Sequence, residues 1–147
     1  MNLHRVTTES LGTLGTAKGA YVLVFRLASG IDVSLKGKAP AHLAPGWYLY
    51  AGSAYGGGGM QARLRRHFLR DKKIHWHIDR LATEAADIMA FAEPDGSECG
   101  LVDRLMKTGQ YIHIMPGFGS SDCQTCESHL LMARGTVPEG GFDSLPI

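Results

Sequence analysis

The sequence has few cysteines, no long apolar run and almost no excess charge, and each shortage excludes a class of protein. Its 147 residues include three cysteines, an odd number that does not build a disulfide framework. No apolar stretch reaches the roughly 20 residues that cross a bilayer, and the first residues lack the apolar segment of a secretory leader. A formal net charge of +1 gives no chain-wide attraction to a polyanion. We therefore expect a soluble, cytoplasmic protein with reduced thiols.

The chain does contain enough apolar material for one packed domain. Hydrophobic residues make up 44% of it, which is too much for a disordered protein. Its length suits a single domain over residues 1–147. Within that domain, the Thr/Gly-rich residues 1–18 are predicted to form a loose lead-in, and the Pro/Gly-rich residues 136–147 an irregular tail.

Apolar periodicity predicts a mixed α/β (α+β) fold, with a small, mainly antiparallel sheet flanked by helices. Residues 20–28 and 47–53 are short runs rich in β-branched and aromatic side chains, as in buried strands. Apolar residues at 60, 64 and 68 indicate a helix over 60–70, and Ser97 is a good N-cap for a helix that ends near Lys107. The other expected elements are strands at 31–35, 85–92 and 111–115, a short helix at 74–82, loops at 36–46 and 116–122, and either a strand or a helix at 128–134.

Charge is unevenly distributed, although it nearly cancels over the whole chain. Residues 60–80 carry seven basic and two acidic side chains, whereas residues 81–147 carry three basic and ten acidic ones. Such a basic segment predicts a local phosphate-binding face, with an ordinary solvated helix face as the alternative. The residues assigned to nucleic-acid binding are Arg65, Arg66, Arg70, Lys72, Lys73, His75 and His77, together with Ser120 and Ser121 of the Gly-rich turn.

Five side chains of the central region suit chemistry at a phosphodiester. Tyr21 and Tyr50 lie on two strands that are expected to pair, which would put both hydroxyls on one side of the sheet. Arg63 and His67 are four residues apart and therefore share a helix face, and the planar donor fork of arginine matches phosphate oxygens. Glu98 is expected on the exposed first turn of its helix, where a carboxylate suits a hard divalent cation.

In this order the residues resemble the signature of the GIY-YIG nuclease superfamily. The matching elements are Gly19-Ala20-Tyr21 for the first motif, Tyr50-Ala51-Gly52 for the second, Arg63 with His67 for the arginine helix, and Glu98 before Leu101-Val102 for the metal-binding glutamate. The resemblance is to a GIY-YIG-like branch of small prokaryotic proteins, some of them fused to DNA-repair enzymes. The tyrosines are 29 residues apart, a wider spacing than the superfamily usually has, and alanine is the middle residue of each motif.

The resemblance implies an endonuclease that hydrolyses DNA phosphodiester bonds with one Mg²⁺ (or Mn²⁺), with DNA repair as its setting. Tyr21 would then orient or deprotonate the attacking water, Arg63 would stabilise the transition state, and Glu98 would hold the metal. Tyr50 and His67 would assist through hydrogen bonds or proton transfer. The alternative is a nucleic-acid-binding module with weak or lost cleavage.

A second set of metal-ligating residue types lies near the C-terminus. Cys123, Cys126 and His129 form a C-x-x-C-x-x-H motif, which places three zinc ligands at chelating spacing. Because structural zinc usually has four clear ligands, a plain turn with free thiols is the preferred interpretation, and a zinc-stabilised structural domain is the third hypothesis. The candidates for a fourth ligand are Cys99, His113 and Asp122.

Overall fold

The computed structural model describes residues 3–34, 40–74, 77–116, 118, 128–134, 137, 142 and 145. Its elements are β1 (His4–Val6), the 3₁₀ helix η1 (Thr8–Leu14), β2 (Gly19–Leu27), β3 (Ile31–Val33), β4 (Ala41–Leu43), β5 (Gly46–Ala54), α1 (Gly59–Phe68), α2 (His77–Ala82), β6 (Asp87–Pro94), α3 (Glu98–Lys107), β7 (Tyr111–His113) and β8 (Leu130–Ala133).

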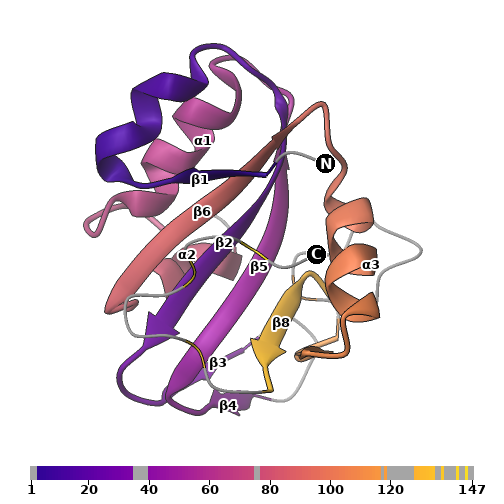
Figure 1. Ribbon diagram of the computed structural model, residues 1–147. Coiled ribbons are helices and arrows are strands. Elements are labelled where there is room, and N and C mark those ends of the chain that lie inside the picture. Colours follow the sequence, from indigo (N-terminus) through magenta and orange to yellow (C-terminus); the bar gives the residue numbers. More distant parts are fainter. Residues whose placement is uncertain are drawn as a thin grey trace.

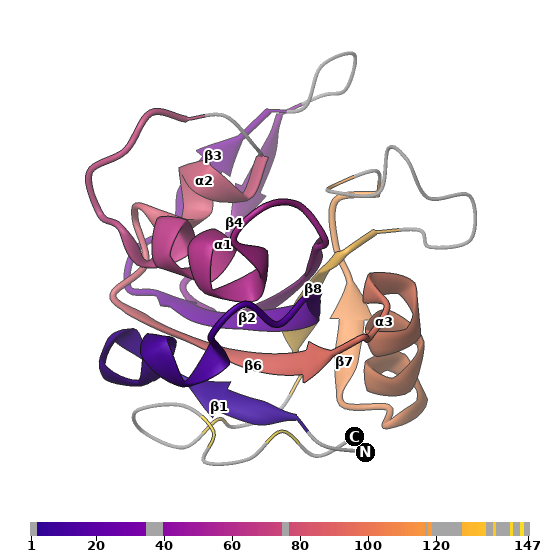
Figure 2. The same ribbon diagram turned by 90° about the horizontal axis from the view of Figure 1, so that it is seen from above.

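Six strands form one antiparallel sheet in the order β1-β6-β2-β5-β8-β7, and β3 pairs with β4 in a second, two-stranded sheet. Helices α1 and α3 lie on opposite sides of the large sheet (Figures 1 and 2). The expected mixed α+β class is thus confirmed. No helix in the described ranges is long and apolar enough to span a bilayer.

The central strands β2 and β5 are buried on both sides, because helices cover both faces of the sheet. In β2 only Arg26 is not fully buried, which explains why the run from Ala20 to Phe25 is apolar without alternation. The register pairs Tyr21 with Gly52 and Leu23 with Tyr50. Since directly opposed residues point to the same face, Tyr21 and Tyr50 both lie on the side that α1 covers.

Two apolar layers hold the sheet between these helices. On the α1 side, Met60 and Leu64 of the helix belong to the same cluster as Leu23, Phe25 and Tyr48 of the strands. On the α3 side, the members of the cluster are Val22, Val24, Leu49, Phe91, Leu101 and Leu105, among others. The i, i+4 spacing of Met60 and Leu64 and of Leu101 and Leu105 gives each helix its apolar stripe.

Two predictions of local structure differ from the observed one, and a third, left open between strand and helix, is decided in favour of a strand. Residues 1–18 were expected to be loose, yet they contain β1, which pairs with β6, and η1, whose Leu11 and Leu14 are buried. The predicted loop over 36–46 contains β4, and the ambiguous segment 128–134 contains strand β8. β1 and β8 pair with strands far away in the sequence, β6 and β5, whereas β4 pairs with the neighbouring β3.

Candidate active site

A hydrogen bond between Tyr21 and His67 lies at the centre of the α1 side. The Tyr21 hydroxyl is 2.6 Å from Nε2 of His67, and each side chain is only 1% exposed. Burial raises the pKa of Tyr21 and, as the main cause, lowers the pKa of His67 to about 3. Both groups are therefore neutral at pH 7. The tautomer of His67 then sets the direction of the hydrogen bond: with the imidazole proton on Nδ1 the phenol donates to Nε2, and with the proton on Nε2 the imidazole donates to the phenol oxygen.

Tyr50 and Glu98 bring a second phenol and a carboxylate to the same place. The ring of Tyr50 lies edge-on to the imidazole of His67, with 6.4 Å between the ring centroids. Burial, followed by the negative charge of Glu98, raises the pKa of Tyr50 to about 12, and the same carboxylate raises the pKa of Tyr21. A charge that acts on both phenols must lie near both. The Glu98 side chain is 33% exposed, so solvent reaches it.

Arg63 completes this group from the helix turn before His67. Its Nη1 donates to the backbone carbonyl of Ser53 on β5, over 3.1 Å. Its positive charge, with a hydrogen bond to the phenol, lowers the pKa of Tyr21 and opposes the larger effect of burial. The structure thus brings together Tyr21, Tyr50, Arg63, His67 and Glu98, which we call the convergent site.

Two glycines make this convergence possible. A Cβ atom on Gly52 would lie 2.5 Å from the hydroxyl oxygen of Tyr21, so only glycine leaves room for the phenol across the strand pair. Gly59, the first residue of α1, has φ of +60°, and a Cβ there would lie 2.4 Å from the carbonyl oxygen of Ala17. The amide of Met60 donates to that same carbonyl, over 2.9 Å. The close approach sets the start of α1, and with it the positions of Arg63 and His67 over the sheet.

A family model described as "Domain of unknown function DUF123" matches residues 20–139. The chain belongs to this family. The matched range contains the whole convergent site and the C-x-x-C-x-x-H motif. No curated protein and no solved structure matches the chain.

Behind the convergent site, the DUF123 domain buries a charged network around Asp79 of α2. Nη2 of Arg66 lies 2.5 Å from Oδ2 of Asp79, whose side chain is fully buried. The amine of Lys72 lies 3.8 Å from Oδ1 of Asp79 and donates to the carbonyls of Arg66 and His67, over 2.8 and 3.0 Å. These contacts fasten the C-terminal end of α1. They also affect the pKa of His67, because Lys72 lowers it and Asp79 raises it.

Several residues assigned to nucleic-acid binding are therefore part of the fold. Arg66 and Lys72 engage the buried carboxylate of Asp79, and Arg70 donates to the carbonyl of Ala85. The charges of Arg66 and Lys72 serve Asp79, because a carboxylate buried in the domain requires cations beside it. Arg70 is exposed, and its assignment to nucleic-acid binding stays a prediction. Arg65 and Lys73 are exposed, as is His77, whose ring packs against Phe118. His75, Ser120 and Ser121 lie outside the described residues.

Sequence reasoning missed Asp79 and the role of Gly52. The local signal for Asp79 was its place between Ile78 and Leu81, both of which are buried, in a short apolar helix. The signal for Gly52 was its position two residues after Tyr50. Neither signal is specific, because only the three-dimensional pairing gives it meaning.

The residues present fit a hard divalent cation at Glu98. In the part of the chain that the structure describes, no group of three or more His, Cys, Asp and Glu side chains could hold a metal ion. Mg²⁺ does not require such a group, because it keeps several waters and takes one or two carboxylates. The partly exposed carboxylate of Glu98, beside two phenols and Arg63, meets that requirement.

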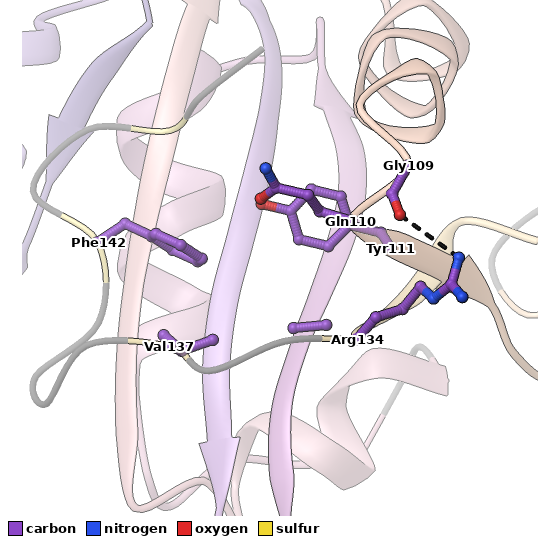
Figure 3. A pocket seen from close by; sticks show the side chains of 7 residues that line it. Gly109, Gln110, Tyr111, Arg134, Val137 and Phe142 are labelled. Carbon is purple, nitrogen blue, oxygen red and sulfur yellow. Dashed lines mark hydrogen bonds between the residues drawn. The ribbon is translucent and has the colours of Figure 1, made fainter.

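A cavity of about 430 Å³ at the C-terminal end of α3 is a different place (Figure 3). It contains none of the predicted site residues, and Glu98 begins the opposite end of the same helix. Arg134 donates to the carbonyl of Gly109 at its edge, over 3.4 Å. The residues that line it are Gly109, Gln110, Tyr111, Ala133, Arg134, Val137 and Phe142.

Proposed function

We propose that this chain is a metal-dependent endonuclease of the GIY-YIG type that hydrolyses DNA phosphodiester bonds, in a cytoplasmic DNA-repair setting. One observation carries the proposal. The Tyr21 phenol hydrogen-bonds to His67 and is subject to the charges of Arg63 and Glu98, so groups from β2, α1 and α3 act on one hydroxyl. The residues that match the GIY-YIG motifs are the ones that meet, which supports a common chemical task.

Tyr21 and His67 provide a route for the proton of an attacking water. In the tautomer that carries the imidazole proton on Nδ1, the phenol donates to Nε2 and its oxygen keeps lone pairs that accept a proton from water. As the water oxygen bonds to phosphorus, its proton moves to the Tyr21 oxygen and the phenolic proton moves to Nε2. The bond from phosphorus to the leaving sugar oxygen breaks, and that oxygen takes a proton from solvent. The imidazolium that forms is stabilised by Asp79, whose charge raises the pKa of His67. The raised pKa of Tyr21 argues against a resting phenolate as the base.

Arg63 and Tyr50 stabilise the phosphate as its charge grows. The guanidinium matches two phosphate oxygens, and donors already in place are worth most where water is excluded. With a pKa near 12, Tyr50 stays protonated at pH 7 and donates a hydrogen bond. A magnesium ion at Glu98 would neutralise charge on the phosphate and at the leaving oxygen.

The burial of Tyr21 favours a second candidate function, a nucleic-acid-binding module with weak or lost cleavage. Its side chain is 1% exposed, so a water molecule must enter the convergent site before it reaches the hydroxyl. In such a module, Arg63 and the exposed Arg65 would contact phosphates, and the Tyr21–His67 pair would only orient α1.

Cleavage assays with a matched pair of variants test the proposal. Wild type, Glu98→Gln and Asp103→Asn are incubated with plain, nicked and branched DNA in Mg²⁺ or Mn²⁺. Asp103 is the control, because it lies on the same helix and pairs with Lys107 at the surface, over 2.8 Å. We expect Glu98→Gln to lose about 100-fold or more in rate and Asp103→Asn to match wild type.

The other outcomes are equally clear. Equal rates for wild type and Glu98→Gln remove Glu98 from the mechanism. A wild type that binds DNA but forms no metal-dependent product from any of the three substrates overturns the nuclease proposal in favour of the binding module.

A further inference from the structure

Tyr55, the residue that follows β5, has the most exposed ring of the five tyrosines. The residue is 52% exposed, whereas the other four tyrosines are buried or half-buried. Single exposed apolar residues are common on protein surfaces and need no special explanation. What distinguishes this ring is the way it is held and the place where it lies.

The hydroxyl of Tyr55 holds the ring against the turn that precedes α3. It donates to the backbone carbonyl of Gly96, 41 residues further along the chain. That turn is itself tightly built, because the amide of Gly96 donates to the carbonyl of Glu93 over 3.0 Å and the Ser97 side chain caps the first turn of α3. The ring is therefore attached at its backbone and at its hydroxyl, so an aromatic partner can stack on it without first ordering a mobile side chain.

The ring lies between the two backbone segments that position the cation and the carboxylate of the convergent site. Two residues before Tyr55, the carbonyl of Ser53 accepts a hydrogen bond from Arg63 over 3.1 Å. Glu98 follows Gly96 by two residues, and two residues of chain span at most about 7 Å. Both segments lie at the same end of the large sheet, because the ends of β5 and β6 flank the start of β2. The ring and the site are thus close enough for the base and the phosphate of one nucleotide to bridge them.

The turn that follows Tyr55 leaves the surface beside the ring open. A Cβ atom on Gly56 or on Gly57 would meet nothing within 4 Å. Neither residue has the positive φ that Gly58 adopts before α1. Since neither the local backbone nor the packing requires glycine at 56 and 57, the missing side chains leave room for a bound molecule over the turn.

A nucleobase is the ligand that suits an exposed phenol ring beside a phosphodiester site. Bases stack on aromatic side chains whatever their sequence, because every base has a π face. A base within a continuous duplex does not offer that face, since its neighbours in the stack cover it. An exposed ring therefore accepts a base where the strand is unpaired, as in a flap, a gap or a single strand.

We propose that Tyr55 stacks on an unpaired base of the bound strand, and that the substrate is DNA with single-stranded nucleotides at the convergent site instead of continuous duplex. This role rests on the proposed function, because the phosphate next to that base would lie between Arg63 and Glu98. Tyr55 binds and orients the strand and takes no part in the proton transfer.

Binding in the absence of divalent metal tests Tyr55 separately from cleavage. Wild type, Tyr55→Ala, Tyr55→Phe and the control Ile112→Ala are titrated at one salt concentration with a single-stranded oligonucleotide and with an abasic strand of the same length. Both strands carry the same phosphate charge, so the difference between the two affinities isolates the bases. We expect wild type to bind the base-bearing strand roughly 5- to 100-fold more tightly. Tyr55→Ala should lose most of that preference, and Ile112→Ala, 40% exposed on β7, should keep it.

Tyr55→Phe separates stacking from a structural role of the hydroxyl. This variant keeps the ring and loses the hydrogen bond to Gly96, so it should retain the preference for the base-bearing strand. Three results would overturn the stacking role: a wild type with equal affinity for both strands, a Tyr55→Ala variant with the full preference, or a Tyr55→Phe variant that loses as much of it as Tyr55→Ala.

Cleavage of branched DNA and of continuous duplex, measured in Mg²⁺, shows which of the two proposals fails. We expect wild type to cut branched DNA faster than duplex, and Tyr55→Ala to lose that advantage. A wild type that cuts both equally and shows no preference for bases overturns the stacking role and leaves the nuclease proposal intact. A wild type that prefers the base-bearing strand but forms no product overturns the nuclease and keeps the stacking role, now in a binding module.

Discussion

The two faces of the large sheet are each covered by one helix, but they differ in what they bury. Between α3 and the sheet, the packing consists of side chains such as Val24, Phe91 and Leu101. On the α1 side, the buried side chains include the imidazole of His67 and the carboxylate of Asp79. Both faces exclude water, yet among the described residues the α1 side is the one that combines exclusion with a network of ionisable groups close to Tyr21.

This difference indicates that the buried polar groups of the α1 side, such as His67 and Asp79, do not serve to stabilise the fold. Burying an ion pair costs several kcal/mol per ion in desolvation, and well-packed apolar residues of similar volume are often as good or better. The α3 side shows that this chain covers a sheet with apolar residues. Where a protein departs from such a solution, the departure marks a working site. The network around Asp79 tunes His67, and that is the function we assign to it.

The largest expected effect comes from removing the carboxylate of Asp79. Asp79→Ala leaves the guanidinium of Arg66 and the amine of Lys72 without the buried anion that both face. We expect a loss of about 3–5 kcal/mol in the free energy of unfolding, measured by urea denaturation. On the other face, Leu101→Ala should cost about 2–5 kcal/mol by leaving a cavity.

A combined variant then separates the two faces. Replacing the whole network, with Asp79→Leu, Arg66→Met and Lys72→Met, should recover most of the stability that Asp79→Ala loses, because no charge is left buried without its partner. Cleavage should not recover with it. A combined variant as unstable as Asp79→Ala would show that the network is needed for folding itself, and the contrast between the faces would then lose its meaning.

A smaller effect is expected from one methyl group at Gly52. In Gly52→Ala, the new Cβ would lie 2.5 Å from the Tyr21 hydroxyl oxygen, so the phenol must leave its place against His67. Overpacking of this kind costs about 1–3 kcal/mol, and we expect cleavage to fall more steeply than stability. Gly12→Ala is the control, because nothing lies within 4 Å of a Cβ there. Unchanged cleavage in Gly52→Ala would exclude a role for the Tyr21 hydroxyl.

The pH dependence of stability gives a direct reading of His67. Its pKa is about 3 in the folded chain and about 6.5 when unfolded, so below pH 6.5 the unfolded state binds a proton that the folded state does not. The contribution of neutral His67 to the free energy of unfolding is therefore fully present above pH 6.5, and it is lost as the pH drops towards 3. From pH 7 to pH 5 the loss should be about 2 kcal/mol.

Urea denaturation of wild type and His67→Gln at both pH values isolates this contribution, since other groups titrate in both proteins. The difference between the free energies of unfolding at pH 7 and at pH 5 should be about 2 kcal/mol smaller in His67→Gln than in wild type. It should persist in His4→Gln, whose side chain is exposed on β1. If wild type and His67→Gln change equally, His67 is not held neutral by burial.

The sequence predicted the parts of the molecule that periodicity and motif order govern. The apolar run of β2 and the i, i+4 stripe of α1 are local patterns, and each gave the right element at nearly the right bounds. The convergent site came from the order of residue types along the chain, and the structure brings those residues together. The strand register was not predictable in this way, and it is the Tyr21–Gly52 pairing that gives the phenol its room on the α1 side.

What the sequence did not reveal is which charges are buried. Arg65 and Arg66 are neighbours of the same type, yet one is exposed and the other contacts a buried carboxylate. A helix places consecutive residues about 100° apart, so the assignment depends on where α2 packs, which no local pattern encodes. For the same reason, β1 and η1 were missed, because long-range contacts define both.

The smallest expected effect is on the salt dependence of DNA binding. It distinguishes the exposed cations of the α1 side from the cations that contact Asp79. If DNA lies along this side, removing the exposed Arg65 should lower the slope of log affinity against log salt by about one unit and weaken binding equally across sequences. Binding measured over a series of KCl concentrations gives that slope. Arg66→Met should alter the slope less than Arg65→Ala, because Arg66 is engaged with Asp79.

Lys107→Ala, at the surface of α3, is the control from the other face, since its side chain is 74% exposed. If the phosphate face is confined to the α1 side, this variant keeps the full slope although it loses the same formal charge. A slope that falls equally in Lys107→Ala and Arg65→Ala would mean that the domain attracts DNA through its overall charge. The α1 side would then be distinguished only by the groups that act on Tyr21.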